Sequence, residues 1–345
     1  MKDVTPHYSG DPAVEASTDA ARVRSAAHRV VAIVTSFRPE PSLLLHCELL
    51  AEQVKQIVVV DDGSGAAADE VLTQLQAQGV RVVRQPENAG IADAINLGYV
   101  TVADYDPELV ITFDQDSRVT PGFVAALVEH FDRSMANGLN VGMVAPQFFM
   151  GLAQTHMPQK RGFLEAYQPI QSGLLMPYAA IRQLGPQRGE FFIDSVDTEY
   201  YQRAIRQGYD CVCAPALNMP HSLGHMLNVR VFGRFLVNGA GNLRSISVSS
   251  PFRYYYRVRN RIILNQMYLL RSPRRVQMLR DTFWEMMHYG FAWYCSRGKG
   301  AYLSVLWAGL KAGLARRMGK IPDAVAETSR KVSWKHAAAA REDRA

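Results

Sequence analysis

Short apolar runs alternate with longer amphipathic segments through the first 130 or so residues of the chain. Four runs rich in β-branched residues are typical of strands buried on both faces, and they occupy residues 30–35, 57–60, 80–84 and 109–113. The segments that follow these runs predict helices over residues 39–53, 69–78, 89–100 and 121–131. This alternation predicts an α/β domain whose mainly parallel sheet carries helices on both faces.

The pattern weakens after residue 140 and changes character near residue 252. Strand-like VGMVAP, GLLMP and CVCAPAL come first, together with a helix over residues 196–207. Three further helices, rich in aromatic and basic residues, are predicted over residues 253–270, 273–294 and 301–318. The chain is therefore divided into a disordered leader, an α/β domain, a basic helical module and a flexible tail, at residues 1–28, 29–252, 253–320 and 321–345.

The composition is that of a globular protein, and its charge is unevenly distributed. The 345 residues are 48% hydrophobic and 20% charged, which excludes a largely disordered or fibrous chain. The net charge is +6, but residues 1–252 hold 19 basic and 26 acidic side chains, whereas residues 253–320 hold 14 basic and 2 acidic ones. The basic module predicts a polyanionic partner or an anionic membrane surface. We do not expect nucleic acid, because no motif for binding it is present and the body is acidic.

Cysteine usage and hydropathy indicate the compartment. Four cysteines are too few for a disulfide scaffold at this length, so we expect reduced thiols. The first 28 residues lack the apolar core of a signal peptide, and no run of 18 or more apolar residues occurs. These features predict a cytoplasmic protein.

Acidic residues follow two of the predicted strands. Asp61 and Asp62 open the sequence DDGSG after residues 57–60, and Asp114, Gln115 and Asp116 follow the strand LVITF. In open α/β sheets, ligands bind beyond the carboxyl ends of the strands. Two carboxylates at one strand end can bind Mg²⁺ or Mn²⁺ together with nucleotide phosphates, although acidic turns are also common as plain turns. The DDGSG segment is neither a dinucleotide fingerprint nor a P-loop.

Three other segments carry candidate chemistry. ENAGIADAINLG, from Glu87, predicts a capped helix with a small-residue face, which packing alone explains. FFIDSVDTEY places Asp194, Asp197 and Glu199 at the start of a helix. There the helix dipole stabilises acidic side chains, which is the plain structural explanation, or one of them serves as a general base. The loop PHSLGH contains His221, and a histidine in a loop is more often a surface group than a ligand.

Taken in order, these segments resemble the family-2 glycosyltransferases of the GT-A fold. The order is VTSFRPEP, VVVDDGS, ENAGIADAINLG, ITFDQDS, FIDSVDTEYYQRA and PHSLGH, over roughly residues 29–320. DSVDTEY followed by HSLG, the run RYYYRVRN and the C-terminal WAGLKAGLARRMGK are most similar to bacterial rhamnosyltransferases of O-antigen and related surface polysaccharides.

The resemblance implies roles for particular residues. The nucleotide-sugar site would comprise Thr35, Phe37, Asp61, Asp62, Asn88, Gly90, Ala94, Asp114 and Gln115. A divalent metal, Mg²⁺ or Mn²⁺, would be bound by Asp116, Asp114 and His221. Asp197 would be the general base, with Asp194 as a second catalytic carboxylate. The sequence departs from the family in having Phe37-Arg38-Pro39 for Tyr-Asn-Pro, and Val196 where the family's paired glutamate stands.

The resemblance further implies an inverting transfer of L-rhamnose from dTDP-β-L-rhamnose to a saccharide or lipid-linked oligosaccharide. A donor that is a UDP-hexose or a UDP-N-acetylhexosamine stays open, because such sugars differ by few contacts. A non-catalytic nucleotide-sugar-binding or lipid-binding protein is the remote alternative. In the basic module, arginines interleave with tyrosines from Arg253 to Arg261, a composition that suits the inner face of the cytoplasmic membrane but also a packed helical subdomain.

Overall fold

The computed structural model describes residues 25–155, 159–220, 225–228, 230–231, 234–235 and 245–334. Its centre is an eight-stranded sheet with the strand order β10-β5-β9-β4-β1-β2-β3, and β6 pairs with β5. The strands are β1 (Val30–Ser36), β2 (Gln56–Asp61), β3 (Arg81–Arg84), β4 (Leu109–Asp114), β5 (Val141–Phe149), β6 (Leu152–Ala153), β9 (Leu174–Pro177) and β10 (Asp210–Met219). Strands β1 to β4 are parallel, as is the β5–β10 pair, and β9 runs antiparallel to β4 and β5. The expectation of a mainly parallel sheet is confirmed.

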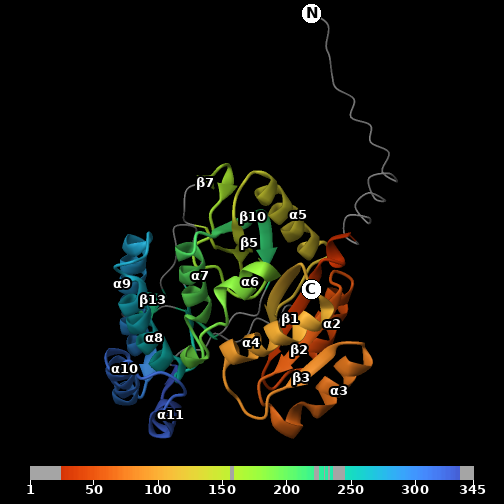
Figure 1. Ribbon diagram of the computed structural model, residues 1–345. Helices are drawn as coiled ribbons and strands as arrows, with labels where there is room; N and C mark the ends of the chain where they lie inside the picture. Colours follow the sequence, from red (N-terminus) through yellow and green to blue (C-terminus); the bar gives the residue numbers. More distant parts are fainter. Residues whose placement is uncertain are drawn as a thin grey trace, which may run out of the picture.

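Helices cover both faces of the sheet, because successive side chains of each central strand point to opposite sides. In β1, Val30, Ala32 and Val34 belong to one core cluster, and Val31 and Ile33 belong to another. The first cluster includes residues of α2 (Ser42–Ala51), α3 (Asp69–Ala77) and α5 (Phe123–Ala136). The second includes residues of α4 (Ile91–Thr101), α6 (Tyr178–Leu184) and α7 (Val196–Arg206). Figure 1 shows the helices on either side of the sheet.

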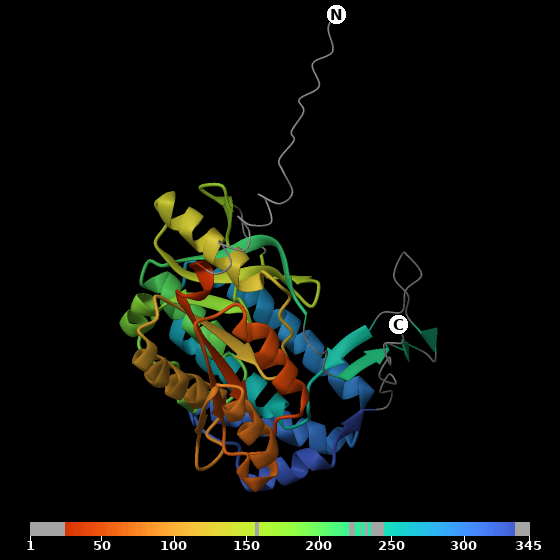
Figure 2. The same ribbon diagram turned by 90° about the vertical axis from the view of Figure 1, so that its right-hand side faces the viewer.

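The three helices predicted after residue 252 are present, and they form a module beside the α/β domain (Figures 1 and 2). They are α8 (Arg253–Tyr268), α9 (Arg275–Cys295) and α10 (Lys299–Leu314), followed by α11 (Asp323–Arg330). The module core is aromatic, with Tyr254, Tyr256 and Tyr302 fully buried. Minor elements are η1 (Gly65–Ala68), η2 (Val102–Tyr105), η3 (Gly189–Phe191), β7 (Gln159–Lys160), β8 (Phe163–Leu164), β11 (His225–Asn228), β12 (Arg230–Val231), β13 (Arg234–Phe235), β14 (Ser245–Val248), β15 (Ser296–Arg297) and β16 (Ser333–Trp334).

The predicted flexible tail is wrong over residues 321–334. This segment forms α11 and β16 and packs against the module, with Val332 in the aromatic core. The backbone N–H of Ile321 donates a hydrogen bond to the hydroxyl of Tyr256 at 2.7 Å. At the other end, residues 25–28 of the expected leader are already folded, and Ala26 is buried in the first core cluster. Residues 1–24 and 335–345 lie outside the described part of the chain.

All four cysteines are buried free thiols, as expected. Burial raises the pKa of Cys47 to about 12, so this thiol is protonated at neutral pH and serves as an apolar group. Among the described residues, we find no helix that combines the length and the hydropathy required to span a membrane.

Candidate active site

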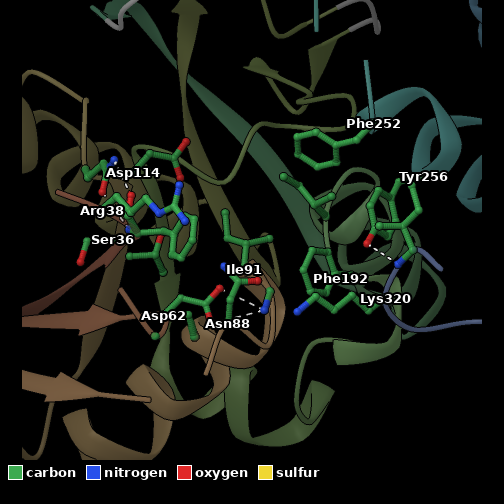
Figure 3. Close-up of a pocket in the computed structure, with 18 of the residues that line it drawn as sticks. Ser36, Arg38, Asp62, Asn88, Ile91, Asp114, Phe192, Phe252, Tyr256 and Lys320 are labelled. Carbon is green, nitrogen blue, oxygen red and sulfur yellow. Dashed lines mark hydrogen bonds between the residues drawn. The ribbon is translucent and has the colours of Figure 1, made fainter. Parts of the chain in front are cut away.

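The carboxyl ends of three strands lie side by side at one edge of the sheet. The register places Ser36 beside Asp61, and Thr35 beside Asp114. A cavity of about 700 Å³ lies at this edge, and Figure 3 shows its lining side chains. Eight of the predicted donor-site residues line it, namely Thr35, Phe37, Asp62, Asn88, Gly90, Ala94, Asp114 and Gln115.

The two neighbouring aspartates after β2 have different environments. Asp61 does not line the cavity, because its buried carboxylate accepts hydrogen bonds from the backbone N–H of Ser64 at 3.0 Å and from the Ser64 hydroxyl. Asp62 does line the cavity, and it accepts hydrogen bonds from the backbone N–H groups of Ala89 and Gly90 at the start of α4, at 2.8 and 3.0 Å. Burial raises the pKa of Asp62.

Two glycines allow backbone segments to meet at the cavity. Gly63 has φ +71°, and a Cβ there would lie 2.2 Å from the carbonyl carbon of Glu87. Gly90 has φ +99°, and its Cβ would lie 2.5 Å from the carbonyl oxygen of Phe192. That same oxygen accepts the N–H of Ile91 at 3.0 Å. The start of α4 is thereby joined to the loop that precedes α7.

Asp114, Gln115 and Asp116, at the end of β4, have different surroundings. Gln115 holds the segment after β1, since its side chain accepts the N–H of Phe37 at 2.9 Å and donates to the Phe37 carbonyl at 3.2 Å. Asp114 is half-buried at the cavity, and its backbone N–H donates to the hydroxyl of Ser172 at 3.3 Å. Asp116 is exposed and does not line the cavity. His221, the third predicted metal ligand, lies outside the described residues.

The loop before α7 is conformationally unusual. Phe192, Asp194 and Ser195 are non-glycine residues with φ of +67°, +63° and +62°. Such conformations cost of order 1–3 kcal/mol each and persist where the surrounding structure enforces them, often at functional sites. Phe192 and Ile193 line the cavity, so this loop forms the wall opposite the strand ends.

The two predicted catalytic carboxylates follow on this loop, and neither lines the cavity itself. Asp194 forms a bidentate ion pair with Arg253, with N–O distances of 2.6 and 3.1 Å. Asp197 is half-buried in the first turn of α7, and its Oδ1 accepts the backbone N–H of Thr198 at 2.7 Å. Burial raises the pKa of Asp197, and the negative charge of Asp194 raises it further.

Most of the run RYYYRVRN packs inward, which agrees with the packed helical subdomain that its composition also allowed. The Arg259 side chain is fully buried and donates to the carbonyls of Phe191, at 2.8 Å, and Gly319. Asn260 donates to the carbonyls of Ile193 and Asp194, both at 2.8 Å. Helix α8 therefore holds the loop before α7 in place through hydrogen bonds to the carbonyls of that loop.

Glu199, the third carboxylate of FFIDSVDTEY, serves the fold. It is fully buried in α7 and accepts hydrogen bonds from Arg203 at 2.5 Å, Arg188 at 3.2 Å and the Tyr268 hydroxyl at 2.5 Å. Its contact with Tyr268 joins α7 to the end of α8.

The sequence analysis missed the part of the cavity that the C-terminal module supplies. Phe252, Tyr256, Lys320, Ile321 and Arg330 line the cavity. Figure 3 shows Phe252, Tyr256 and Lys320 on the side that faces the strand ends. The ring of Phe192 stacks on that of Tyr256, with centroids 5.2 Å apart. Lys320 and Arg330 bring two cations to a cavity that also contains Asp62 and Asp114. Lys320 ends the noted sequence WAGLKAGLARRMGK, but nothing in the local pattern predicted that it would share a cavity with Asp62 and Asp114, which lie far away in the sequence.

The strand ends at the cavity lie within a segment that matches a known family. Residues 31–177 match the family described as Glycosyl transferase family 2. This segment is therefore similar to a family-2 glycosyltransferase domain, and it contains most of the sheet and the strand-end residues that line the cavity.

Particular relatives extend this comparison. The chain is 28% identical over 268 residues to the dTDP-rhamnosyl transferase RfbF of Shigella flexneri, which covers 72% of this chain and 84% of the relative. It is 37% identical over 81 residues to the uncharacterized protein MJ1222 of Methanocaldococcus jannaschii, covering 24% and 32% of the two chains. Among solved structures, S. aureus TarS 1–349 in complex with UDP-GlcNAc has a TM-score of 0.47 and 12% identity, covering 72% of this chain and 69% of TarS.

Proposed function

We propose that this chain is an inverting, metal-dependent rhamnosyltransferase. It would move L-rhamnose from dTDP-β-L-rhamnose to a saccharide acceptor, free or lipid-linked, in the synthesis of a bacterial surface polysaccharide. The cavity carries this proposal, because it combines acidic strand ends with two cations from the C-terminal module. The named activity of the Shigella relative, which aligns with most of this chain, supports the choice of donor.

The donor would lie across the strand ends. Thr35, Phe37 and Asp62 would contact the base and ribose, because a carboxylate accepts hydrogen bonds from hydroxyl and base N–H groups. Lys320 and Arg330 would face the diphosphate, whose charge matches theirs.

The residues at this edge fit a hard divalent cation. Asp114 and Asp116 supply carboxylate oxygens, the ligands that Mg²⁺ and Mn²⁺ prefer. Within the described residues, no group of three or more His, Cys, Asp and Glu side chains could hold a metal ion. The remaining coordination positions would therefore belong to donor oxygens and water. When bound, the ion would neutralise charge on the departing diphosphate.

Asp197 would take the proton of the acceptor hydroxyl as that hydroxyl attacks the anomeric carbon. A raised pKa makes its carboxylate a better base at neutral pH. Attack from the face opposite the diphosphate inverts the anomeric carbon in a single displacement, so that an α-L-rhamnoside forms from a β-L-rhamnosyl donor. Asp194, which is paired with Arg253, lies beside the base, and its negative charge raises the pKa of Asp197.

We further propose that the C-terminal module rests on the anionic inner face of the cytoplasmic membrane. In α9, one outward face is apolar, and its side chains are between 46% and 68% exposed, namely Val276, Leu279, Phe283, Trp284, Met286, Met287 and Tyr294. An exposed apolar patch of this extent marks an interaction site. Exposed basic residues accompany it at Arg275, Arg280 and Lys299, which complements anionic lipid.

A donor panel tests the proposed activity. The melting temperature of the protein would be measured with Mn²⁺ and with dTDP-rhamnose, UDP-glucose, UDP-N-acetylglucosamine or GDP-mannose. A ligand that binds only the folded state raises the melting temperature, so dTDP-rhamnose should raise it most, and only with the metal. A shift with a UDP-sugar alone would overturn the choice of donor.

A further inference from the structure

A second cavity, of about 640 Å³, lies between the α/β domain and the C-terminal module. Residues near β6 and the segment 167–170 form one wall, and α8 and α9 form the other. Its lining combines Gln154 and Gln168 with an aromatic side chain, Trp284, that is 62% exposed. An exposed aromatic plate is suited to the C–H face of a sugar ring. The amides of Gln154 and Gln168 already bond within the protein, to Pro146 and Ile170 and to Tyr167 and Asp281 respectively.

Most charges in this cavity already have a partner. Arg257 pairs with Glu285 at 3.1 Å, and Arg280 lies 3.7 Å from Asp281. Asp281 also accepts the hydroxyl of Tyr167 at 2.6 Å. His288 is neutral at physiological pH, because burial, aided by Arg257, lowers its pKa to about 4.

Arg261 is the exception. Its Nε and Nη1 atoms are buried, and neither has a hydrogen-bond partner within the described part of the chain. Buried N–H groups without hydrogen bonds are costly for folding. Three arginines and two acidic residues line this cavity, so its lining carries one excess positive charge. A planar guanidinium fork matches carboxylate and phosphate groups.

Helix α8 connects this cavity to the first one. Arg253, Arg257 and Arg261 are spaced four residues apart, so they share one face of the helix. Arg253 pairs with Asp194 near the proposed base, and Arg261 lies about 12 Å further along the helix axis at 1.5 Å per residue. That spacing suits an acceptor that reaches from the second cavity to the base.

We propose that the second cavity binds the acceptor and that Arg261 binds an oxyanion carried by it. The inference rests on the proposed function, because it assigns the acceptor side of the same reaction. The oxyanion is a phosphate, and it comes either from a lipid-linked acceptor or from a soluble sugar phosphate. The lipid source is favoured by the position of Trp284, which both lines the cavity and belongs to the exposed apolar face of α9.

The test is isothermal titration calorimetry with dTDP and Mn²⁺ held at saturation, so that the donor cavity is filled. Glucose 1-phosphate, methyl glucoside and farnesyl phosphate are the probes. We expect both phosphates to bind and the neutral glucoside to bind at least tenfold more weakly, because a hydrogen bond to a charged group contributes enough to change affinity by that factor. R261M should lose the phosphate preference, and R261K should recover part of it.

Two controls make the result specific. R280Q removes a charge from the same cavity that already has an acidic neighbour, so it should change phosphate affinity by less than threefold, about the change expected from an exposed ion pair. R261M should melt close to the wild-type temperature, because the buried Nε and Nη1 atoms that it removes make no hydrogen bond within the described part of the chain. A large drop would show that Arg261 serves the fold and would overturn the proposal.

The remaining outcomes distinguish a failure of the acceptor site from a failure of the proposed function. Tighter binding of farnesyl phosphate identifies the lipid source, and tighter binding of glucose 1-phosphate identifies the soluble one. If dTDP binds but neither phosphate does, or if R261M binds them as the wild type does, the acceptor site is wrong and the donor proposal stands. If dTDP itself does not bind, the failure belongs to the proposed function.

Discussion

Replacing Asn260 should damage both stability and activity. Its side-chain amide donates to the carbonyls of Ile193 and Asp194, both at 2.8 Å, and the adjoining Phe192, Asp194 and Ser195 adopt positive φ. A buried carbonyl left unsatisfied costs about 1–3 kcal/mol. Two such losses predict that N260A lowers the free energy of unfolding by about 2–6 kcal/mol.

The same change should slow the reaction. Once released, the loop can relax its strained backbone and move the proposed base, Asp197, from its position. A displacement of about 1 Å can reduce a rate about 100-fold. We therefore expect kcat for dTDP release from dTDP-rhamnose to fall by about that factor in N260A, measured at a temperature where the variant is folded.

Two further variants sharpen this prediction. N260D keeps the size of the side chain but loses the amide donor, so it should resemble N260A. N265A removes another asparagine of α8, whose amide donates to the hydroxyl of Thr282 at 2.9 Å, and it should cost about 1 kcal/mol with an unchanged kcat. The reasoning is refuted if N260A loses less than about 1 kcal/mol in urea unfolding and retains its kcat.

Three other outcomes are expected. D197N should abolish transfer and melt at or above the wild-type temperature, because a raised carboxyl pKa means that ionisation of Asp197 opposes folding. The excess stability of D197N should vanish as the pH falls below the ordinary aspartate pKa, and a lower melting temperature of D197N at pH 7 would contradict this reasoning. Removing divalent metal with EDTA should stop dTDP release, and Mn²⁺ should restore it, whereas full activity in EDTA would exclude the metal. L279Q/F283Q should sediment less with phosphatidylglycerol vesicles than L45Q, a control at an exposed leucine on α2, and equal sedimentation would remove α9 from the membrane proposal.

Much of the α/β domain was predictable because its strands are buried on both faces. Such strands are continuous apolar runs, and β1, β2 and β4 lie within a residue of the predicted positions. The acidic residues that end them, Asp62 and Asp114, lie where parallel topology predicts. The sequence could not show that Asp61 and Asp62 have different roles, because adjacent carboxylates after a strand look alike. Only the folded turn shows that the Asp61 carboxylate bonds to Ser64.

The C-terminal module was harder to read, because its arginines have partners far away in the sequence. A spacing of four residues places Arg253, Arg257 and Arg261 on one helix face. The spacing does not show that this face packs against the α/β domain, where Arg253 pairs with Asp194. The folded segment around α11 was missed for a similar reason, since its few apolar residues gain stability only from the aromatic core that they cover.

The most direct test of the account is calorimetric binding of dTDP-rhamnose, with Mn²⁺, to the wild type and to D114N. The substitution removes a carboxylate charge from the cavity while keeping the size of the side chain. We predict that the wild type binds and that D114N binds at least tenfold more weakly, with an unchanged melting temperature in the absence of ligand. Equal binding by both proteins would contradict the placement of the donor at the strand ends.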